Sequence, residues 1–344
     1  MARALVIFVS VAVALSVLGA AYLYKKPADS KPTAIVPFDW EYIRQVSLKE
    51  GSARAYEEFA REAAGRSPSA QHVAAHIFGK ALYNAEGVGA VAVCDDRFLF
   101  GCVHAVLIAA VGDKGLGAIG ELQTVCTTVR ANFRVHCEHG IGHGIVGVLG
   151  YEDDKIVQSL DLCDTHLPKS NPINGCKGGV FMENVLRLAH DGTTHPRAFD
   201  ETKKWGPCDS LDAKSLDGCA FWQPMWWVSS ISIPEDVEGF AKEMGAWCTA
   251  APGGASAEGF CIAGIGNVMH ALIGTETERT ARICATVTED PGYRYRCHEL
   301  AARRYLYSVP TEVALRACDG LHPEISAECR TNALQAVENA DLAQ

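Results

Sequence analysis

The longest uninterrupted apolar stretch of the chain lies at its N-terminus. Residues 4–24 are twenty-one residues without a charged side chain, and Lys25 and Lys26 end the run. A helix of this length can cross a hydrocarbon core of about 30 Å. A cleaved signal peptide, the alternative, has a shorter apolar core and a small-x-small cleavage site, which the sequence around Leu18 and Ala20 fits poorly. We therefore predict a transmembrane anchor over residues 1–24.

Residues 25–38 differ in composition from what precedes and follows them. They are rich in Pro, Ala and Ser, with prolines at positions 27, 32 and 37, which is typical of an extended tether. The segment 39–344 is predicted to be the folded domain.

Apolar positions in the folded domain recur at helical spacing in pairs of segments. The first pair is predicted over Ser52–Ala64 and Ala70–Asn84, and residues 66–69 break the pattern between them. Later pairs are marked by cysteines. The first cysteine of each pair lies near the end of a helical pattern, and the second opens an apolar helical run, as in residues 137–149. Each unit is therefore predicted to be a helical hairpin with helices A and B.

The fourteen cysteines are spaced as seven pairs. From the second pair on, the first cysteines of successive pairs are 34 to 45 residues apart, and ten or twelve residues separate the two members. The chain contains no Cys-x-x-Cys, which disfavours a zinc ribbon, a thioredoxin-like motif and c-type haem attachment. We predict seven disulfides within the repeats: Cys94–Cys102, Cys126–Cys137, Cys163–Cys176, Cys208–Cys219, Cys248–Cys261, Cys284–Cys297 and Cys318–Cys329.

Paired cysteines persist in oxidising compartments. They therefore place the folded domain outside the cytoplasm, in the periplasm or the extracellular space, on a single-pass anchor in the cytoplasmic membrane. A net charge of -10 argues against nucleic acid as a partner, because nucleic acid binding rewards clustered Lys and Arg.

One unit resembles a known repeat family. Phe78-Gly-Lys-Ala-Leu-Tyr83, followed by Glu86-Gly-Val-Gly89, resembles Sel1-like repeats, which are TPR-like αα-hairpin modules with secreted, disulfide-stapled members. The resemblance covers about one unit and implies architecture alone. About eight stacked hairpins would form an all-α solenoid, or a closed α/α toroid if the curvature is high, with the B helices inside.

Aligning the B helices on their second cysteine reveals a shared register of histidines. His104 and His139 stand two positions after that cysteine, and His143 stands six positions after it. In the first unit Ala70 takes the place of the cysteine, and His72 and His76 occupy the same two offsets. Residues four apart lie on one face of a helix, so His72/His76 and His139/His143 each form a two-nitrogen clamp.

The shared register predicts a metal site. Neighbouring helices pack about 8–10 Å apart, close enough for imidazoles of adjacent units to converge. Imidazole suits iron, copper and zinc, so we predict one of these ions as the cofactor, without distinguishing among them. On the next B helix Glu183 is a candidate carboxylate ligand or base. The alternative is that each histidine is a packed core residue bonded to backbone carbonyls.

Two further patterns accompany the histidines. Gly140, Gly179 and Gly264 share one offset from their cysteines, and Gly142 and Gly266 share another. Glycine inside a helix is unfavourable by about 1 kcal/mol relative to alanine, so these positions indicate close helix packing or space for a substrate. The aromatic residues in 221–227 indicate core packing, or the lining of such a space.

Two function classes follow from these patterns. The first is a metal-binding protein outside the cytoplasm, either a metal-dependent oxidoreductase or a hydrolase, with open positions on the ion for water, oxygen or substrate. The second is a non-catalytic scaffold that binds a protein or peptide on the concave face of the stack. A bis-histidine haem protein is a third alternative.

Overall fold

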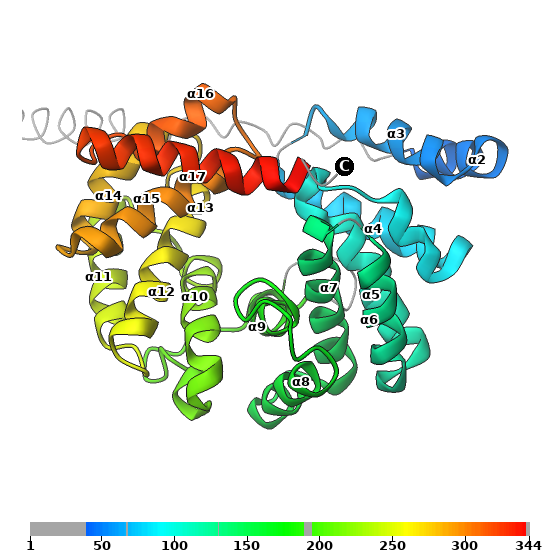
Figure 1. Ribbon diagram of the computed structural model, residues 1–344, viewed down its shortest axis with the longest axis horizontal. Helices are drawn as coiled ribbons and strands as arrows, with labels where there is room; N and C mark the ends of the chain where they lie inside the picture. The colour runs from blue at the N-terminus through cyan, green and yellow to red at the C-terminus, as the bar shows by residue number, and fades with distance from the viewer. Residues whose placement is uncertain (1–38, 67, 130, 189–194, 342–344) are drawn as a thin grey trace, which may run out of the picture. The chain divides into compact units, whose positions relative to one another are not determined.

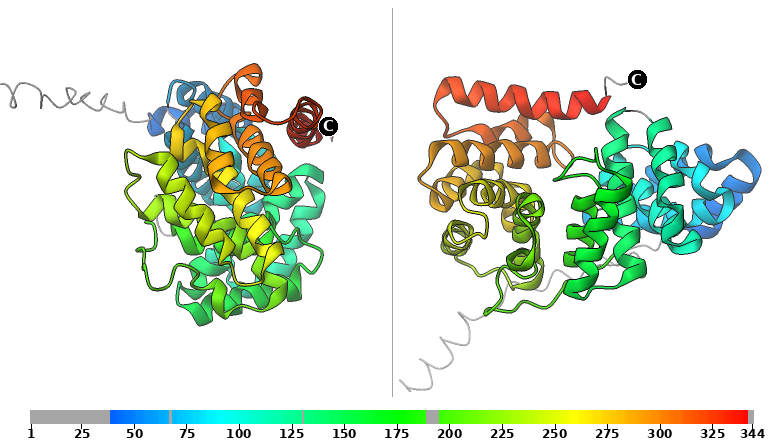
Figure 2. Two further views of the ribbon diagram at one scale, coloured as in Figure 1. Left: turned by 90° about the vertical axis from the view of Figure 1, so that its left-hand side faces the viewer. Right: turned by 60° about the horizontal axis from the view of Figure 1, so that its bottom comes forward.

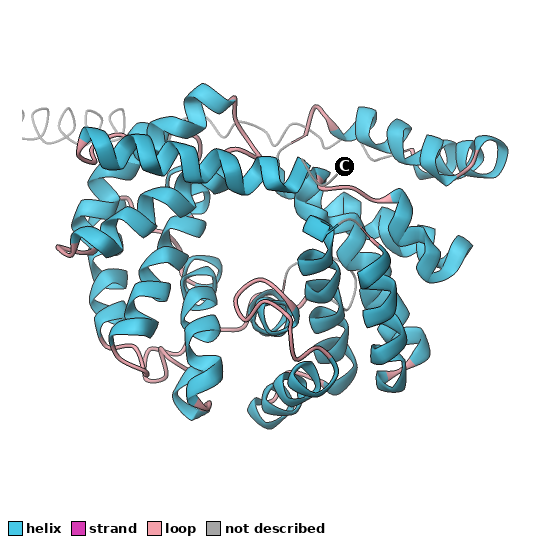
Figure 3. Ribbon diagram, in the orientation of Figure 1, coloured by secondary structure: helices cyan, strands magenta, loops and turns pink. Residues whose placement is uncertain are grey.

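The computed structural model describes residues 39–341 except 67, 130 and 189–194, and every regular element in these residues is helical (Figure 3). The chain divides into two compact units, Met1–Gln45 and Val46–Gln344. The predicted all-α class is therefore confirmed. The predicted anchor and tether, residues 1–38, lie outside the described residues. In the part that is described, no helix combines the length and apolarity needed to cross a membrane.

The described residues contain one B helix for each of the eight predicted units. The eight B helices are α4 (Pro68–Glu86), α5 (Gly101–Lys114), α7 (Ala131–Leu149), α9 (Cys176–Leu186), α10 (Ala213–Ser230), α12 (Ala255–Asn267), α15 (Pro291–Tyr305) and α17 (Pro323–Asp341). The remaining α-helices in the described residues are α2 (Trp40–Glu50), α3 (Ser52–Ala63), α6 (Ile119–Thr128), α8 (Asp153–His166), α11 (Val237–Thr249), α13 (Met269–Ile273), α14 (Thr280–Val287) and α16 (Thr311–Ala314).

The B helices pack against one another in chain order within the unit that starts at Val46. Contacts run from α4 to α5, α7, α9, α10, α12, α15 and α17, each helix lying against the next (Figure 1). The last B helix, α17, also contacts α7 (Figure 2). Each repeat therefore completes its core with residues of its neighbours, as stacked hairpins do.

All seven predicted disulfides are present with the predicted partners. Each joins the segment before a B helix to that helix. The prediction that the second cysteine opens the B helix holds for α5 and α9 and is wrong for the other five, in which it is the seventh residue: α7, for example, begins at Ala131, six residues before Cys137. The more polar residues before the apolar run are helical as well. Their Cα–Cα distances of 5.5–5.9 Å lie in the usual range for disulfides. No described cysteine is free. The cysteines thus fix the register of each B helix from α5 onward.

The prediction of a helix A in every unit is wrong for two units. Before α5 the described chain forms a 3-10 helix over Gly87–Val93, and before α10 a 3-10 helix over Cys208–Ser210. The first segment consists of Gly, Ala and the β-branched Val, of which Gly and Val are poor helix formers. The second follows Pro196 and Pro207, which lack the backbone N–H that a helix interior needs.

The glycines of equal offset lie where neighbouring B helices touch. A Cβ on Gly140 would lie 3.1 Å from the Cα of His104, and one on Gly264 would overlap the carbonyl of Phe221. Gly142, Gly179 and Gly266 face the carbonyls of Cys176, His139 and Cys297 in the same way. Close helix packing therefore accounts for these glycines. The tryptophans of α10 are core residues too, since Trp226 and Trp227 are almost fully buried.

This packing predicts opposite effects for two helix-interior glycines. Gly264→Ala is expected to lower the free energy of unfolding by about 1–3 kcal/mol, because the new methyl group forces α10 and α12 apart. Gly112→Ala, in α5 with open space around it, is expected to raise that free energy by about 0.5–1 kcal/mol. Denaturant titrations measure both. Equal effects of the two substitutions would contradict the packing account.

Candidate metal centre

The five histidines of shared register come from three B helices in sequence. His72 and His76 lie on α4, His104 on α5, and His139 and His143 on α7. Because α5 packs against both α4 and α7, the two histidine pairs approach His104 from either side. Ring centroids of neighbouring members are 4.7–6.3 Å apart. We call these five residues the histidine group.

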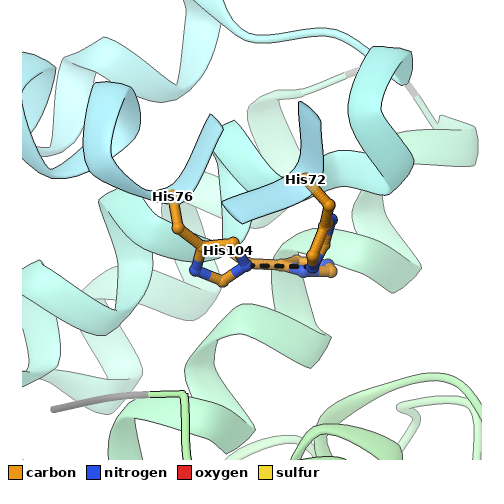
Figure 4. A group of neighbouring side chains, drawn as sticks. All are labelled: His72, His76 and His104. Atoms are coloured by element: carbon orange, nitrogen blue, oxygen red, sulfur yellow. Dashed lines mark hydrogen bonds between the residues drawn. The ribbon is translucent and has the colours of Figure 1, made fainter. Parts of the chain in front are cut away.

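Three members of the histidine group can hold a metal ion. His72, His76 and His104 each offer a ligand atom, and these atoms lie within 4.8 Å of one another (Figure 4). The Nε2 atoms of His72 and His76 are joined by a hydrogen bond of 3.2 Å, which an ion bound to both nitrogens would replace. Two nitrogens bound at 2.0–2.1 Å to one tetrahedral ion are separated by about 3.3 Å. The α4 pair therefore already has the spacing of two ligands of one ion.

The tautomer of His72 is set by a backbone carbonyl. Its Nδ1 lies 2.7 Å from the carbonyl oxygen of Phe98, which can only accept, so Nδ1 carries the proton. Neutral imidazole has one N–H, and the lone pair of His72 is therefore on Nε2, the atom that faces His76. A hydrogen bond of this kind, from the second ring nitrogen, orients metal-binding histidines in general.

The carbonyl of Phe98 is held by an unusual stretch of backbone. Phe98, Leu99 and Phe100 have φ values of 59°, 55° and 61°, a left-handed conformation that is unfavourable for residues with a Cβ. Aromatic contacts accompany it: the ring of Phe98 lies 5.2 Å from that of Phe59, and Phe100 stacks on His136 at 3.5 Å. Strain of this kind is concentrated at functional sites.

His104 occupies the middle of the histidine group and is 4 % exposed. Neither Nδ1 nor Nε2 of His104 has a hydrogen-bond partner, and the Nε2 of His143 has none either. A buried polar atom without a partner costs about 1–3 kcal/mol. The unfavourable burial of these nitrogen atoms is offset only if a metal ion or another ligand binds them.

The α7 pair is held by partners of the same kind. His139 Nδ1 donates to the carbonyl oxygen of Asn174 at 3.0 Å, and His143 Nδ1 donates to Glu183 Oε2 at 2.8 Å. The other oxygen of Glu183 accepts a hydrogen bond of 2.7 Å from the Tyr151 hydroxyl. Glu183, predicted as a ligand or base, thus has both carboxylate oxygens engaged and orients His143.

Burial keeps four members of the histidine group uncharged. It lowers the pKa of His72 to about 4 and the pKa values of His76, His104 and His139 well below the ordinary value, and the neighbouring imidazoles lower them further. These four rings are neutral at pH 7 and carry lone pairs, which is the form that binds a metal.

A cavity of about 610 Å³ lies beside the α4 end of the group. Gln71, Phe98 and Leu99 line it together with the charged residues Glu57 and Arg97. Phe98 connects this cavity to the group through the carbonyl that binds His72 Nδ1, while none of the five histidines lines it. The cavity is large enough for a small molecule.

Other histidines and large side chains lie at the margin of the group or elsewhere. His136 stacks on Phe100 with its ring centroid 6.4 Å from that of His104, and Trp222 lies 5.6 Å from His139. Met182 packs against the hydrophobic core. His298 is buried in α15 and donates through Nδ1 to the carbonyl oxygen of Ala317 at 2.5 Å. It resembles a group member in burial, although it lies outside the group.

Sequence reasoning missed the residues that orient the histidines. Phe98 and Asn174 act through backbone carbonyls, so their side chains carry no signal of the role. Tyr151 lies just after α7, and its hydroxyl meets Glu183 of α9 because α9 packs against α7. Comparisons with known proteins offer no independent assignment, since no family model, curated protein or solved structure matches the chain.

Proposed function

We propose that this chain is a metal-binding helical repeat protein of an oxidising compartment, which holds a transition-metal ion on His72, His76 and His104. The observation that carries the proposal is the meeting of three imidazoles from two adjacent helices, with one tautomer fixed and both nitrogens of His104 without partners. A packed core histidine normally has a hydrogen bond on at least one nitrogen, as His298 does.

The ligand set is consistent with zinc, copper or iron. Three protein ligands leave a fourth position open in a tetrahedral site, which is the arrangement of catalytic rather than structural zinc. A cavity lined by Gln71 and Phe98 offers a place for a small molecule close to His72, although no member of the histidine group lines it. An oxidoreductase or a hydrolase is therefore the class of enzyme that we propose, and the ion decides between them.

The location of the protein is part of the proposal. Seven disulfides and the lack of a free cysteine in the described chain support an exported domain. The apolar residues 4–24 support an anchor in the cytoplasmic membrane. The contact of α17 with α7 favours a closed arrangement of the repeats over an open solenoid.

The test is metal analysis of the full-length protein, exported, purified in detergent and dialysed against zinc, copper or anaerobic ferrous iron. We expect at least one equivalent of one of these ions, and we expect His76→Ala to weaken its binding by more than about 100-fold. His298→Ala is the matched control, because it removes a buried histidine outside the group and should leave binding unchanged. A metal-free wild-type protein, or a Soret band from haem, would overturn the proposal.

A further inference from the structure

The α7 half of the histidine group is built like the α4 half. In each half two histidines one turn apart have ring centroids 4.7 or 4.8 Å apart, with interplanar angles of 69° and 64°. In each half Nδ1 of the first histidine donates to a backbone carbonyl from the segment before a following B helix, Phe98 or Asn174. The site on α4 and α5 thus has a counterpart on α7.

The rings around the α7 pair have the spacing that one ion requires. An imidazole bound at 2.0–2.1 Å has its centroid about 3.2 Å from the ion, so two rings of a tetrahedral site are about 5.2 Å apart. His104 is 5.0 Å from His139 and 5.5 Å from His143, while the α7 pair is separated by 4.8 Å. By ring spacing these three match one ion as closely as the α4 set, in which His104 is 6.3 and 6.1 Å away. Among the described residues only His72, His76 and His104 have ligand atoms within 4.8 Å of one another, so the α7 set must turn its rings to bind an ion.

The number of imidazoles and a nearby buried carboxylate also favour a second ion. Five imidazoles exceed the four ligands of a tetrahedral ion. The α7 half contains a fully buried carboxylate, Glu183, whose hydrogen bond to His143 Nδ1 leaves the unpartnered Nε2 of that ring as its ligand atom. A negative charge behind a metal-bound histidine strengthens it as a ligand and offsets the charge of a cation.

We infer that the protein binds a second transition-metal ion on His139 and His143, with His104 between the two ions. The inference rests on the proposed function, since the first ion occupies His72 and His76. His104 has two buried nitrogens without partners. Its ring supplies one ligand atom to each ion once its single N–H proton is released to solvent as the second ion binds, which leaves a bridging imidazolate. The centre is then a pair of imidazole-bound ions.

The stoichiometry of metal binding tests this inference. Full-length wild-type protein, His76→Ala, His139→Ala and the control His298→Ala are loaded with zinc, passed through a chelating resin and analysed for metal per chain. We expect two ions in the wild type, one in each of the two group variants and two in the control. Circular dichroism checks that each variant keeps its helical content.

The outcomes separate the inference from the proposed function. No ion in the wild type overturns both. One ion that His76→Ala removes and His139→Ala leaves overturns only the second ion, and one ion that both variants remove shows a single shared site and also overturns it. A measurement on the wild type alone guards against misfolded variants: anomalous diffraction from zinc-loaded crystals is expected to show two peaks in the histidine group, and a single peak contradicts the inference.

Discussion

Replacing His104 with leucine is expected to stabilise the metal-free protein and to eliminate its metal binding. Both ring nitrogens of His104 are buried without partners, so an apolar side chain of similar size removes an unfavourable burial. We expect the free energy of unfolding in a chelator to rise by about 1–3 kcal/mol. Zinc then stabilises the wild type by mass action and leaves the variant unchanged.

The control substitution is expected to change the free energy of unfolding in the opposite direction. His298 is 1 % exposed, but its Nδ1 donates to the Ala317 carbonyl, so His298→Leu leaves a buried acceptor without its partner. We expect that variant to be destabilised in the chelator and to bind zinc normally. Urea titrations with and without zinc measure the free energy of unfolding of both variants. If His104→Leu destabilises the metal-free protein as His298→Leu does, His104 is an ordinary core residue.

Removing the Cys94–Cys102 disulfide is expected to affect both stability and the metal centre. The loop that it closes contains Phe98, whose carbonyl orients His72, and Cys102 begins the helix that carries His104. C94A/C102A should lower the free energy of unfolding by about 2.5 kcal/mol through loop entropy. Zinc affinity should fall by about 10-fold or more, because the left-handed turn and the helix start lose their link.

A second disulfide separates these two effects. C248A/C261A opens a loop of sequence separation 13 between α11 and α12, which contribute no member of the histidine group. The loss of stability should be similar, about 3 kcal/mol, while zinc affinity stays at the wild-type value. Calorimetric zinc titrations below the unfolding transition of both variants provide the comparison. Equal zinc affinities would show that the Cys94–Cys102 loop does not position the ligands.

The helical periodicity and the cysteine spacing were sufficient to predict the alternating helices and all seven disulfides. Both are local: the two cysteines of a pair, one before or near the end of an element and one within the first two turns of the next, are close in space because few residues separate them. The same argument failed where local composition opposes a helix, in residues 87–93 and near Pro196 and Pro207. There the disulfides form without a preceding α-helix.

The sequence by itself determined which histidines share a position, because the cysteines give every B helix from α5 onward a common reference point and Ala70 takes that place in α4. Only the tertiary structure decided what surrounds them. Whether rings on α4, α5 and α7 face one another depends on how closely those helices pack, and the identity of the atoms that hold His72 and His139 depends on backbone carbonyls of later units. A carbonyl is common to every residue, so no pattern of side chains marks it. Glu183 could be recognised as a nearby carboxylate, but its role in orienting His143 follows from the packing of α9 on α7.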